Sequence, residues 1–216
     1  MISILLPIYN GERYVSSSIE SILNQTFKDF ELLIAFNGTE DNSKQIVSNY
    51  NDPRIRIFDY GQDAGKAKTL NKLIREAKFD WLALQDDDDV WLPNKLQMQS
   101  IYTTECDVIG TFIEYINEDG KVTGRPTLAS SSENIRNLSL SGTNQVANTS
   151  TIFKKSIALE VAGWKEGLDG IEDFDFWLRL MRLGKKFINI PEVLVQHRLH
   201  TRSNFNTKNH DLKKIL

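Results

Sequence analysis

The chain has 216 residues, of which 40% are hydrophobic and 25% charged, so it is long enough to bury one sizeable core and fits one domain. Its 26 basic and 29 acidic residues are intermixed and leave a net charge of −3, which provides no broad basic field for a nucleic-acid backbone; nucleic acid is not an expected partner. Cys106 is the only cysteine and no run approaches the roughly 20 apolar residues of a transmembrane helix, which favours a cytoplasmic protein whose membrane contact is at most peripheral.

The first 84 residues alternate between apolar runs and amphipathic stretches. Residues 2–9 form a nearly continuous apolar run, which is typical of a strand buried on both faces of a parallel sheet. Val15, Ile19 and Ile22 then repeat with helical spacing. The same alternation predicts further strands and helices at residues 30–36, 42–50, 55–60, 67–77 and 81–84. This order indicates an α/β protein with a doubly wound sheet and helices on both faces.

Beyond residue 93 the pattern becomes mixed. Pro93 suits the first turn of a helix that runs to about residue 103, and a long strand is predicted over 107–116. The serines at 130–132 and the turn around 141–142 indicate a mobile loop. The last predicted elements are a helix around 174–181, a strand at 193–195 and a polar tail after about residue 203.

Four consecutive aspartates, Asp86 to Asp89, follow directly on the predicted strand over 81–84. That places them at a carboxyl end of the sheet, where open α/β folds bind ligands. Neighbouring carboxylates repel one another, and a hard divalent cation such as Mn²⁺ or Mg²⁺ would relieve the repulsion, commonly together with substrate phosphates. The alternative is a solvated acidic turn.

Residues 85–96 resemble the metal-binding DXD segment of glycosyltransferase family 2 and the helix that follows it. Three further segments resemble the same family in the same order: 6–10 its first strand and nucleotide-binding turn, 65–71 the start of its third helix, and 172–180 its acidic catalytic segment. The resemblance covers about residues 2–203. It implies the GT-A fold, which is a Rossmann-like doubly wound mixed sheet, and an inverting transfer of a sugar from a nucleoside-diphosphate sugar to an acceptor hydroxyl.

The resemblance also implies roles for individual residues. Asp88 is expected to bind the metal directly, Mn²⁺ or Mg²⁺, with Asp86 and His200 as further ligands. Asp173 is expected to be the general base that accepts the proton of the acceptor hydroxyl. The residues expected to bind the donor nucleotide are Pro7, Tyr9, Asn37, Asn71, Asp86, Asp87 and Arg198, the last through its planar guanidinium on the diphosphate.

The expected organisation is a single GT-A domain over residues 1–216. Residues up to about 93 would bind the nucleotide sugar, residues 94–203 would form the acceptor and catalytic half, and 204–216 would be the polar tail. The acceptor would be a glycan, a lipid-linked molecule or a protein. One departure concerns the base: the family usually carries two adjacent acids after the second strand, the first of which contacts uracil, whereas this chain has Phe36 and Asn37. Asn37 can still hydrogen-bond a base, so a UDP-sugar is the expected donor.

Several of these residues have structural alternatives. The Tyr9 and Phe36 rings either stack on the base or complete the core. The acids at 172–175 either take part in catalysis or stabilise the start of a helix. His197 and His200 are either structural or ligands, and Trp164 lies either near the acceptor or in the core. Lys66 and Lys68 either face phosphate or lie on the outer face of a helix.

Two other functions are open on the residues alone. Asp86-x-Asp88-x-Val90 after an apolar strand also resembles the nucleophile motif of haloacid-dehalogenase-type phosphatases, but that motif normally opens its domain and here four predicted strands precede it. A non-catalytic module that binds a nucleotide sugar is the second alternative, because Phe36 stands where the family has an acid.

Overall fold

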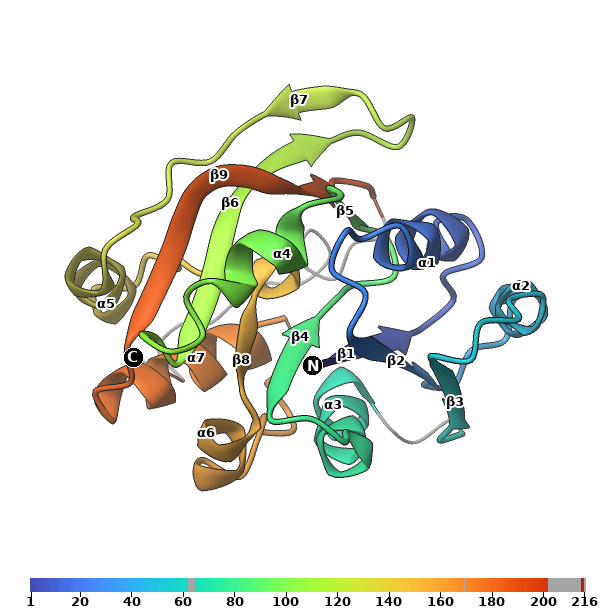
Figure 1. Ribbon diagram of the computed structural model, residues 1–216, viewed down its shortest axis with the longest axis horizontal. Coiled ribbons are helices and arrows are strands. Elements are labelled where there is room, and N and C mark those ends of the chain that lie inside the picture. Colours follow the sequence, from blue (N-terminus) through green and yellow to red (C-terminus); the bar gives the residue numbers. More distant parts are fainter. Residues whose placement is uncertain (62–64, 169, 202–214, 216) are drawn as a thin grey trace.

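A nine-stranded mixed sheet runs through the part of the chain that the computed structural model describes, residues 1–61, 65–168, 170–201 and 215 (Figure 1). The strands are β1 (Ile2–Ile8), β2 (Phe30–Phe36), β3 (Ile55–Asp59), β4 (Trp81–Leu84), β5 (Val90–Trp91), β6 (Val108–Ile116), β7 (Val122–Gly124), β8 (Ile152–Lys154) and β9 (Phe187–Arg198). Their order across the sheet is β3-β2-β1-β4-β8-β6-β9-β5, and β7 pairs with β6. The helices are α1 (Val15–Leu23), α2 (Ser43–Ser48), α3 (Gly65–Glu76), α4 (Lys95–Ser100), α5 (Ser132–Leu140), α6 (Lys155–Glu160) and α7 (Glu172–Arg182).

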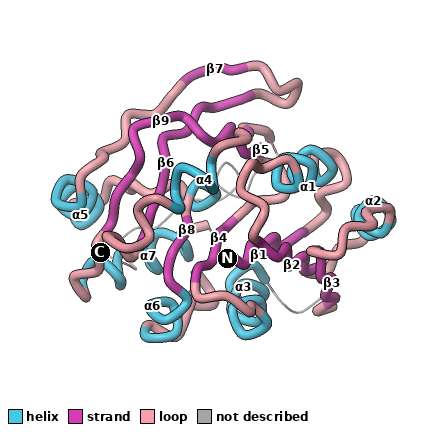
Figure 2. The backbone as a smooth tube through the Cα atoms, in the orientation of Figure 1, coloured by secondary structure: helices cyan, strands magenta, loops and turns pink. Residues whose placement is uncertain are grey.

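The first four strands are parallel, so their carboxyl ends meet at one edge of the sheet. β1 lies between β2 and β4, and β2 also pairs with β3. Helices cover both faces of these strands, which is why β1 and β2 read as nearly continuous apolar runs (Figure 2). The predicted doubly wound α/β architecture is therefore correct.

The remaining strands close the sheet with mixed directions. β8 is antiparallel to both β4 and β6, whereas β9 is parallel to β6 and antiparallel to β5. The β6–β9 register shifts where Pro191 and Glu192 of β9 have no partner. Proline lacks the N–H that a regular ladder needs, so an irregular point is where a strand tolerates it. Beyond it β9 continues to Arg198, three residues past the predicted 193–195, and ends beside β5 and the acidic turn.

Two apolar layers hold the helices to the sheet. On one face α1, α2 and α4 pack against the side chains that include Ile4, Ile34 and Ile109, and on the other α3, α5, α6 and α7 pack against those that include Leu5 and Leu33. Adjacent residues of one strand thus serve opposite layers, as the alternation of side chains along a strand requires. Both faces are covered, and the polar residues at the strand ends are left to form a site.

Two local expectations are corrected. The segment predicted as a mobile loop around 130–142 contains α5, whose start is fixed by the Ser131 Oγ accepting the backbone N–H of Asn134 at 3.3 Å. The helix predicted from Pro93 to about 103 is shorter, from Lys95 to Ser100.

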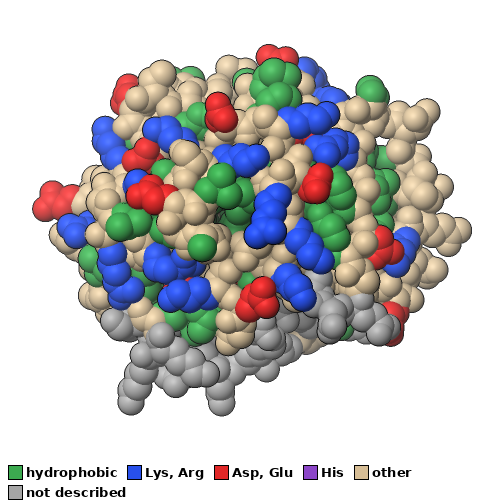
Figure 3. Space-filling view, turned by 90° about the horizontal axis from the view of Figure 1, so that it is seen from below, with side chains coloured by type: hydrophobic (Ala, Val, Ile, Leu, Met, Phe, Trp, Pro, Cys, Tyr) green, Lys and Arg blue, Asp and Glu red, His purple; other side chains and the backbone are tan. Residues whose placement is uncertain are grey.

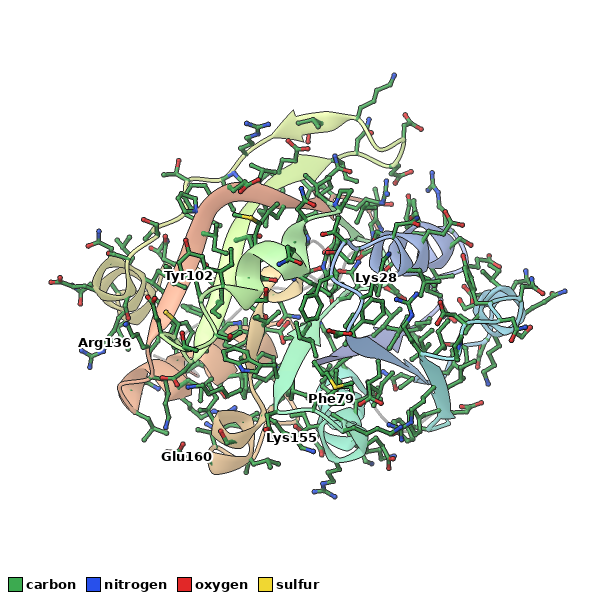
Figure 4. All side chains as sticks on the ribbon, in the orientation of Figure 1. Lys28, Phe79, Tyr102, Arg136, Lys155 and Glu160 are labelled. Atoms are coloured by element: carbon green, nitrogen blue, oxygen red, sulfur yellow. The ribbon has the colours of Figure 1, made fainter. Side chains whose placement is uncertain are left out.

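The start of α6 is fixed at the end of β4 that lies opposite the acidic turn. There, near Phe79, the Lys155 ammonium donates to the carbonyl of Ala77 and the Lys155 backbone N–H donates to the carbonyl of Asp80 (Figure 4).

Candidate active site

The acidic turn leaves the carboxyl end of β4 and is fixed from beneath by Gln85, which is 1% exposed. The Gln85 amide nitrogen donates to the Ser18 hydroxyl at 2.9 Å and to the Asp89 carbonyl at 2.8 Å, and the amide oxygen accepts from the Thr149 hydroxyl at 2.9 Å. These bonds hold the turn that carries the four aspartates in one conformation. Each of them turns to a different partner, so the run is not the solvated acidic turn of the alternative prediction.

Asp86 meets an acid from the other half of the chain through one lysine. The Lys66 ammonium lies 2.9 Å from Asp86 Oδ1 and 3.1 Å from Asp173 Oδ2. All three side chains are partly buried. Burial opposes the charge of Lys66, but the carboxylates of Asp173 and Asp86 raise its pKa well above the ordinary value. The ammonium is therefore charged, and it joins α3, the acidic turn and α7 at one point.

Asp173 is held at both of its carboxylate oxygens. Oδ2 contacts Lys66, and Oδ1 accepts the indole N–H of Trp164 at 2.8 Å. Burial raises the pKa of Asp173 to about 7, against the opposing effect of the Lys66 charge. The side chain is thus occupied by these two donors, although it lies in the first turn of α7 where acids often serve as caps.

The loop that carries Trp164 is tied to α3 by Asn71. The Asn71 amide nitrogen donates to the Trp164 carbonyl at 2.8 Å, and its oxygen accepts the Trp164 backbone N–H at 2.9 Å. The structure therefore gives Asn71 a partner within the protein, and a contact with the donor nucleotide stays a prediction. Trp164 itself is 2% exposed and packs in the core, while its N–H reaches the site.

Asp87 points to the turn that follows β1. Its Oδ2 accepts the backbone N–H of Tyr9 at 3.2 Å. It also comes so close to Gly11 that a Cβ at that position would lie 2.5 Å from the same oxygen, so a larger residue there would displace the Asp87 carboxylate. Burial, together with the charge of Asp88, raises the pKa of Asp87 well above its ordinary value.

Asp88 and Asp89 face two histidines, His197 near the end of β9 and His200 just beyond it. Asp88 Oδ2 lies 2.8 Å from His200 Nε2, and Asp89 Oδ2 lies 3.0 Å from His197 Nδ1. Burial works to raise the pKa of Asp88, but the His200 hydrogen bond and the His197 charge outweigh it and lower that pKa. Burial also opposes the charge of His197, yet Asp89 raises the pKa of His197 to about 9. His200 thus lies beside the predicted metal ligand, whereas His197 forms a buried ion pair.

Arg198 acts within the protein as a clamp. It is 5% exposed, and its guanidinium donates to the carbonyls of Asp88 at 2.9 Å and of Asn117 at 3.0 Å. It also stacks 4.4 Å above the Tyr14 ring. These contacts fix the end of β9 to the acidic turn and to the β6–β7 turn. The predicted contact with the diphosphate stays a prediction, because the described donors serve backbone carbonyls.

The predicted base-binding residues lie side by side at the ends of β1 and β2. Ile8 pairs with Phe36, so Tyr9 and Asn37 follow at neighbouring positions, and the Asn37 N–H donates to the Ile8 carbonyl at 3.0 Å. Tyr9 is 63% exposed and is not part of the core, whereas Phe36 is buried and completes it. Pro7 lies just inside β1. The Tyr9 ring therefore does not fill the core, which was the structural alternative to its contact with the base.

The donor set at Asp88 and His200 fits a divalent cation whose remaining ligands come from elsewhere. Within residues 1–61, 65–168, 170–201 and 215, no group of three or more acidic, histidine or cysteine side chains converges closely enough to hold a metal ion. One carboxylate and one imidazole do face each other, and ions of this kind commonly take one or two protein carboxylates together with substrate phosphates. Asp86 is paired with Lys66, so its part in the metal site stays a prediction.

Lys66 is one of the site residues that the sequence left undecided. It shares the helical face of Thr69, Leu70 and Leu73, which lie three, four and seven residues on and are all buried. Lys68 shares no such face. The helical spacing therefore already indicated that Lys66 faces inward. Only the fold shows that Asp86 and Asp173 lie beside its ammonium.

Sequence comparisons relate the chain to known proteins. The model of the glycosyl transferase family 2 matches residues 3–159. The O-antigen biosynthesis glycosyltransferase WbnJ of Escherichia coli is 34% identical over 210 residues, which cover 94% of this chain and 81% of that protein.

Two solved structures share the fold at low identity. TarS of S. aureus in complex with UDP-GlcNAc superposes with a TM-score of 0.80 at 17% identity, over 99% of this chain and 63% of that one. The mannosyltransferase PcManGT of Pyrobaculum calidifontis, in complex with GDP-Man and Mn²⁺, gives 0.72 at 14% identity, over 94% and 58%. The fold is therefore that of the GT-A glycosyltransferases. Because the family model and the WbnJ sequence both match, this chain belongs to glycosyltransferase family 2.

Proposed function

We propose that the protein transfers a sugar from a nucleoside-diphosphate sugar to an acceptor hydroxyl and inverts the anomeric carbon. The observation that carries the proposal is the contact of the Lys66 ammonium with both Asp86 and Asp173. It brings an acid of the nucleotide-side turn and an acid of α7 to one point. A single displacement needs a base on one side of the anomeric carbon and the leaving group on the other, and these two acids would lie on those two sides.

Asp173 would be the general base. Its carboxylate would accept the proton of the acceptor hydroxyl as that oxygen bonds to the anomeric carbon. A base works best when its pKa lies near the working pH, and burial brings the pKa of Asp173 to about 7. Trp164 and Lys66 would hold the carboxylate in one direction during the transfer.

Asp88 would hold Mn²⁺ or Mg²⁺, with His200 and Asp86 as further ligands. When bound, the ion would neutralise negative charge on the departing nucleoside diphosphate. Asp87 and Tyr9 would shape the adjoining pocket for the nucleotide, and Asn37 would contact the base. The Mn²⁺ in the PcManGT complex and the UDP-GlcNAc in the TarS complex support a metal and a UDP-sugar.

The acceptor would be a carbohydrate, free or carried on a lipid or a protein. The likeness to an O-antigen biosynthesis enzyme favours a growing glycan. No helix in the described ranges has both the length and the apolar character to cross a bilayer. A cytoplasmic location is part of the proposal.

The test compares two substitutions in one assay of donor turnover. Asp173→Asn is expected to lower kcat about 10²-fold or more, with unchanged affinity for the nucleoside diphosphate, because it removes a base and keeps the shape. Asp88→Asn is expected to remove metal-dependent activity with the melting temperature unchanged. Full activity in excess chelator would show that no metal takes part, and turnover within a few-fold of wild type in Asp173→Asn would move the base to Glu172 or Asp175.

The same preparation decides between the proposal and its rivals. A binding module would bind the nucleotide sugar without even slow hydrolysis of the donor. A phosphatase would release phosphate from an aryl phosphate and lose that activity in Asp86→Asn. Membership of glycosyltransferase family 2 favours transfer over both.

A further inference from the structure

The Asn71 amide bonds one residue of another segment through both its nitrogen and its oxygen. Its side chain bonds both the N–H and the carbonyl of Trp164, 93 positions further along the chain. The approach is so close that a Cβ on Gly163 would lie 2.0 Å from Asn71 Oδ1, and Gly163 has a φ of +70°. Both features require glycine at that position. The loop before α7 is therefore built around the Asn71 amide.

The Trp164 indole is equally fixed. Its ring stacks on Phe176 with centroids 4.2 Å apart and meets the edge of Phe153 at 6.0 Å. With the backbone held by Asn71 and the ring held by the core, the indole N–H has one direction. That direction leads to Asp173 Oδ1 at 2.8 Å.

We propose that Asn71 is a positioning residue for Asp173 and that it acts through Trp164. The inference rests on the proposed role of Asp173 as the base. α3 would then serve Asp173 at both oxygens, directly through Lys66 at Oδ2 and indirectly through Asn71 and Trp164 at Oδ1. A residue that orients a reacting group through a second residue acts on the rate of the chemical step and leaves ground-state binding unchanged.

The proposal differs from the sequence-based expectation in what it predicts for ligand affinity. A nucleotide contact at Asn71 would make its substitution weaken binding of UDP. A positioning role would leave UDP affinity within about twofold and lower kcat, because substrate binding does not depend on the direction of one carboxylate. The split between kcat and affinity therefore separates the two roles.

The experiment uses the full chain and two variants that make small changes. Asn71→Asp keeps the acceptor for the Trp164 N–H and loses the donor to its carbonyl. Trp164→Phe removes the indole N–H and keeps an aromatic ring on Phe176. Trp177→Phe is the matched control: within the described residues its indole N–H has no hydrogen-bond partner, and it packs in the same aromatic cluster.

We expect Asn71→Asp and Trp164→Phe each to lower kcat by tenfold or more, with UDP affinity within twofold by calorimetry. The double variant should be no slower than the slower single one, because both changes break one chain of contacts. Trp177→Phe should keep kcat within twofold. Independent, multiplying losses in the double variant, or weaker UDP binding in Asn71→Asp with normal kcat, would overturn the proposal.

Asp173→Asn in the same assay separates two failures. If Asp173→Asn is inactive and both test variants keep wild-type kcat, only the positioning role is wrong. If Asp173→Asn keeps the wild-type kcat, Asp173 is not the base, and the positioning role of Asn71 is then wrong as well.

Discussion

At the scale of single residues, Lys66 is the cation on which the geometry of the site depends. Its ammonium separates Asp86 from Asp173, whose carboxylates would otherwise face each other with nothing between them. Like charges at that distance disfavour ionisation of both groups. The lysine therefore favours the ionised form of the proposed base, against the effect of burial, and holds it in place.

Replacement of Lys66 by Met is expected to lower kcat about tenfold or more, since loss of a charged hydrogen bond is worth about 1.5 to 3 kcal/mol. Lys66→Arg should retain part of the activity because it keeps the charge. Arg75→Met, at an exposed position near the other end of the same helix, is the control and should behave like wild type. Unchanged kcat in Lys66→Met would show that Lys66 does not contribute to the reaction.

The pKa of Asp173 predicts a pH dependence. The carboxyl must be ionised to accept a proton, and burial raises its pKa from 3.8 to about 7. Activity is therefore expected at and above neutral pH and should be lost as the pH falls through about 7. The acid limb of a kcat against pH profile measures this directly. A limb near pH 4 would mean that an exposed carboxyl, and not Asp173, controls the rate.

At the scale of elements, α4 carries a lysine that the site does not use. Lys95 is fully buried, with its ammonium 3.8 Å from the centre of the Trp91 ring and 2.9 Å from Gln99 Oε1. Burial lowers the pKa of Lys95 well below 10.5. The unfolded chain therefore binds more protons than the folded one between these two pKa values, and stability should rise with pH across that window.

Lys95→Met should raise the free energy of unfolding near pH 7 by about 1 to 4 kcal/mol, by analogy with the replacement of a buried ion pair by apolar residues of similar volume. It should also flatten the rise of stability with pH. Urea unfolding at several pH values measures both effects. Lys28→Met, at an exposed lysine labelled in Figure 4, is the control and should leave the pH dependence unchanged. A loss of stability in Lys95→Met would mean that the Gln99 bond matters more than the burial of the amine.

At the scale of the whole molecule, the two predicted halves share one sheet. β4 of the first half pairs with β8 of the second, and β5 pairs with β9. The face seen from below in Figure 3 mixes Lys and Arg with Asp, Glu and apolar side chains, in keeping with the absence of a broad basic field in the sequence. Ligands that bind at the strand ends should therefore stabilise the fold as one unit.

UDP with Mn²⁺ is expected to raise the melting temperature more than GDP with Mn²⁺. At a concentration of 100 times Kd a ligand adds about 2.7 kcal/mol, which corresponds to roughly 5 to 11 °C for a protein of this size. Asn37→Ala should reduce the shift for UDP, because a hydrogen bond to the base is worth about 1 kcal/mol. An equal or larger shift with GDP would assign a different donor nucleotide.

The sequence by itself determined the parallel half of the fold and the position of the acidic turn. Apolar runs that end before Asn10-Gly11 and before Gln85-Asp86 are local signals, because burial on both faces leaves strands few polar positions. Ordered motifs also identified the family. The short elements α5, α6 and β8 were missed, since three to nine residues carry too little periodicity to stand out.

Only the tertiary structure decided which side chains meet. Asp173 lies 107 residues from Lys66 and Asn71 lies 93 from Trp164, and no local pattern encodes contacts over such separations. The four aspartates illustrate the same limit: they are chemically identical in the sequence, yet each has a different partner. Partner choice depends on where β9, α3 and α7 end in space, and packing of the two apolar layers fixes those ends.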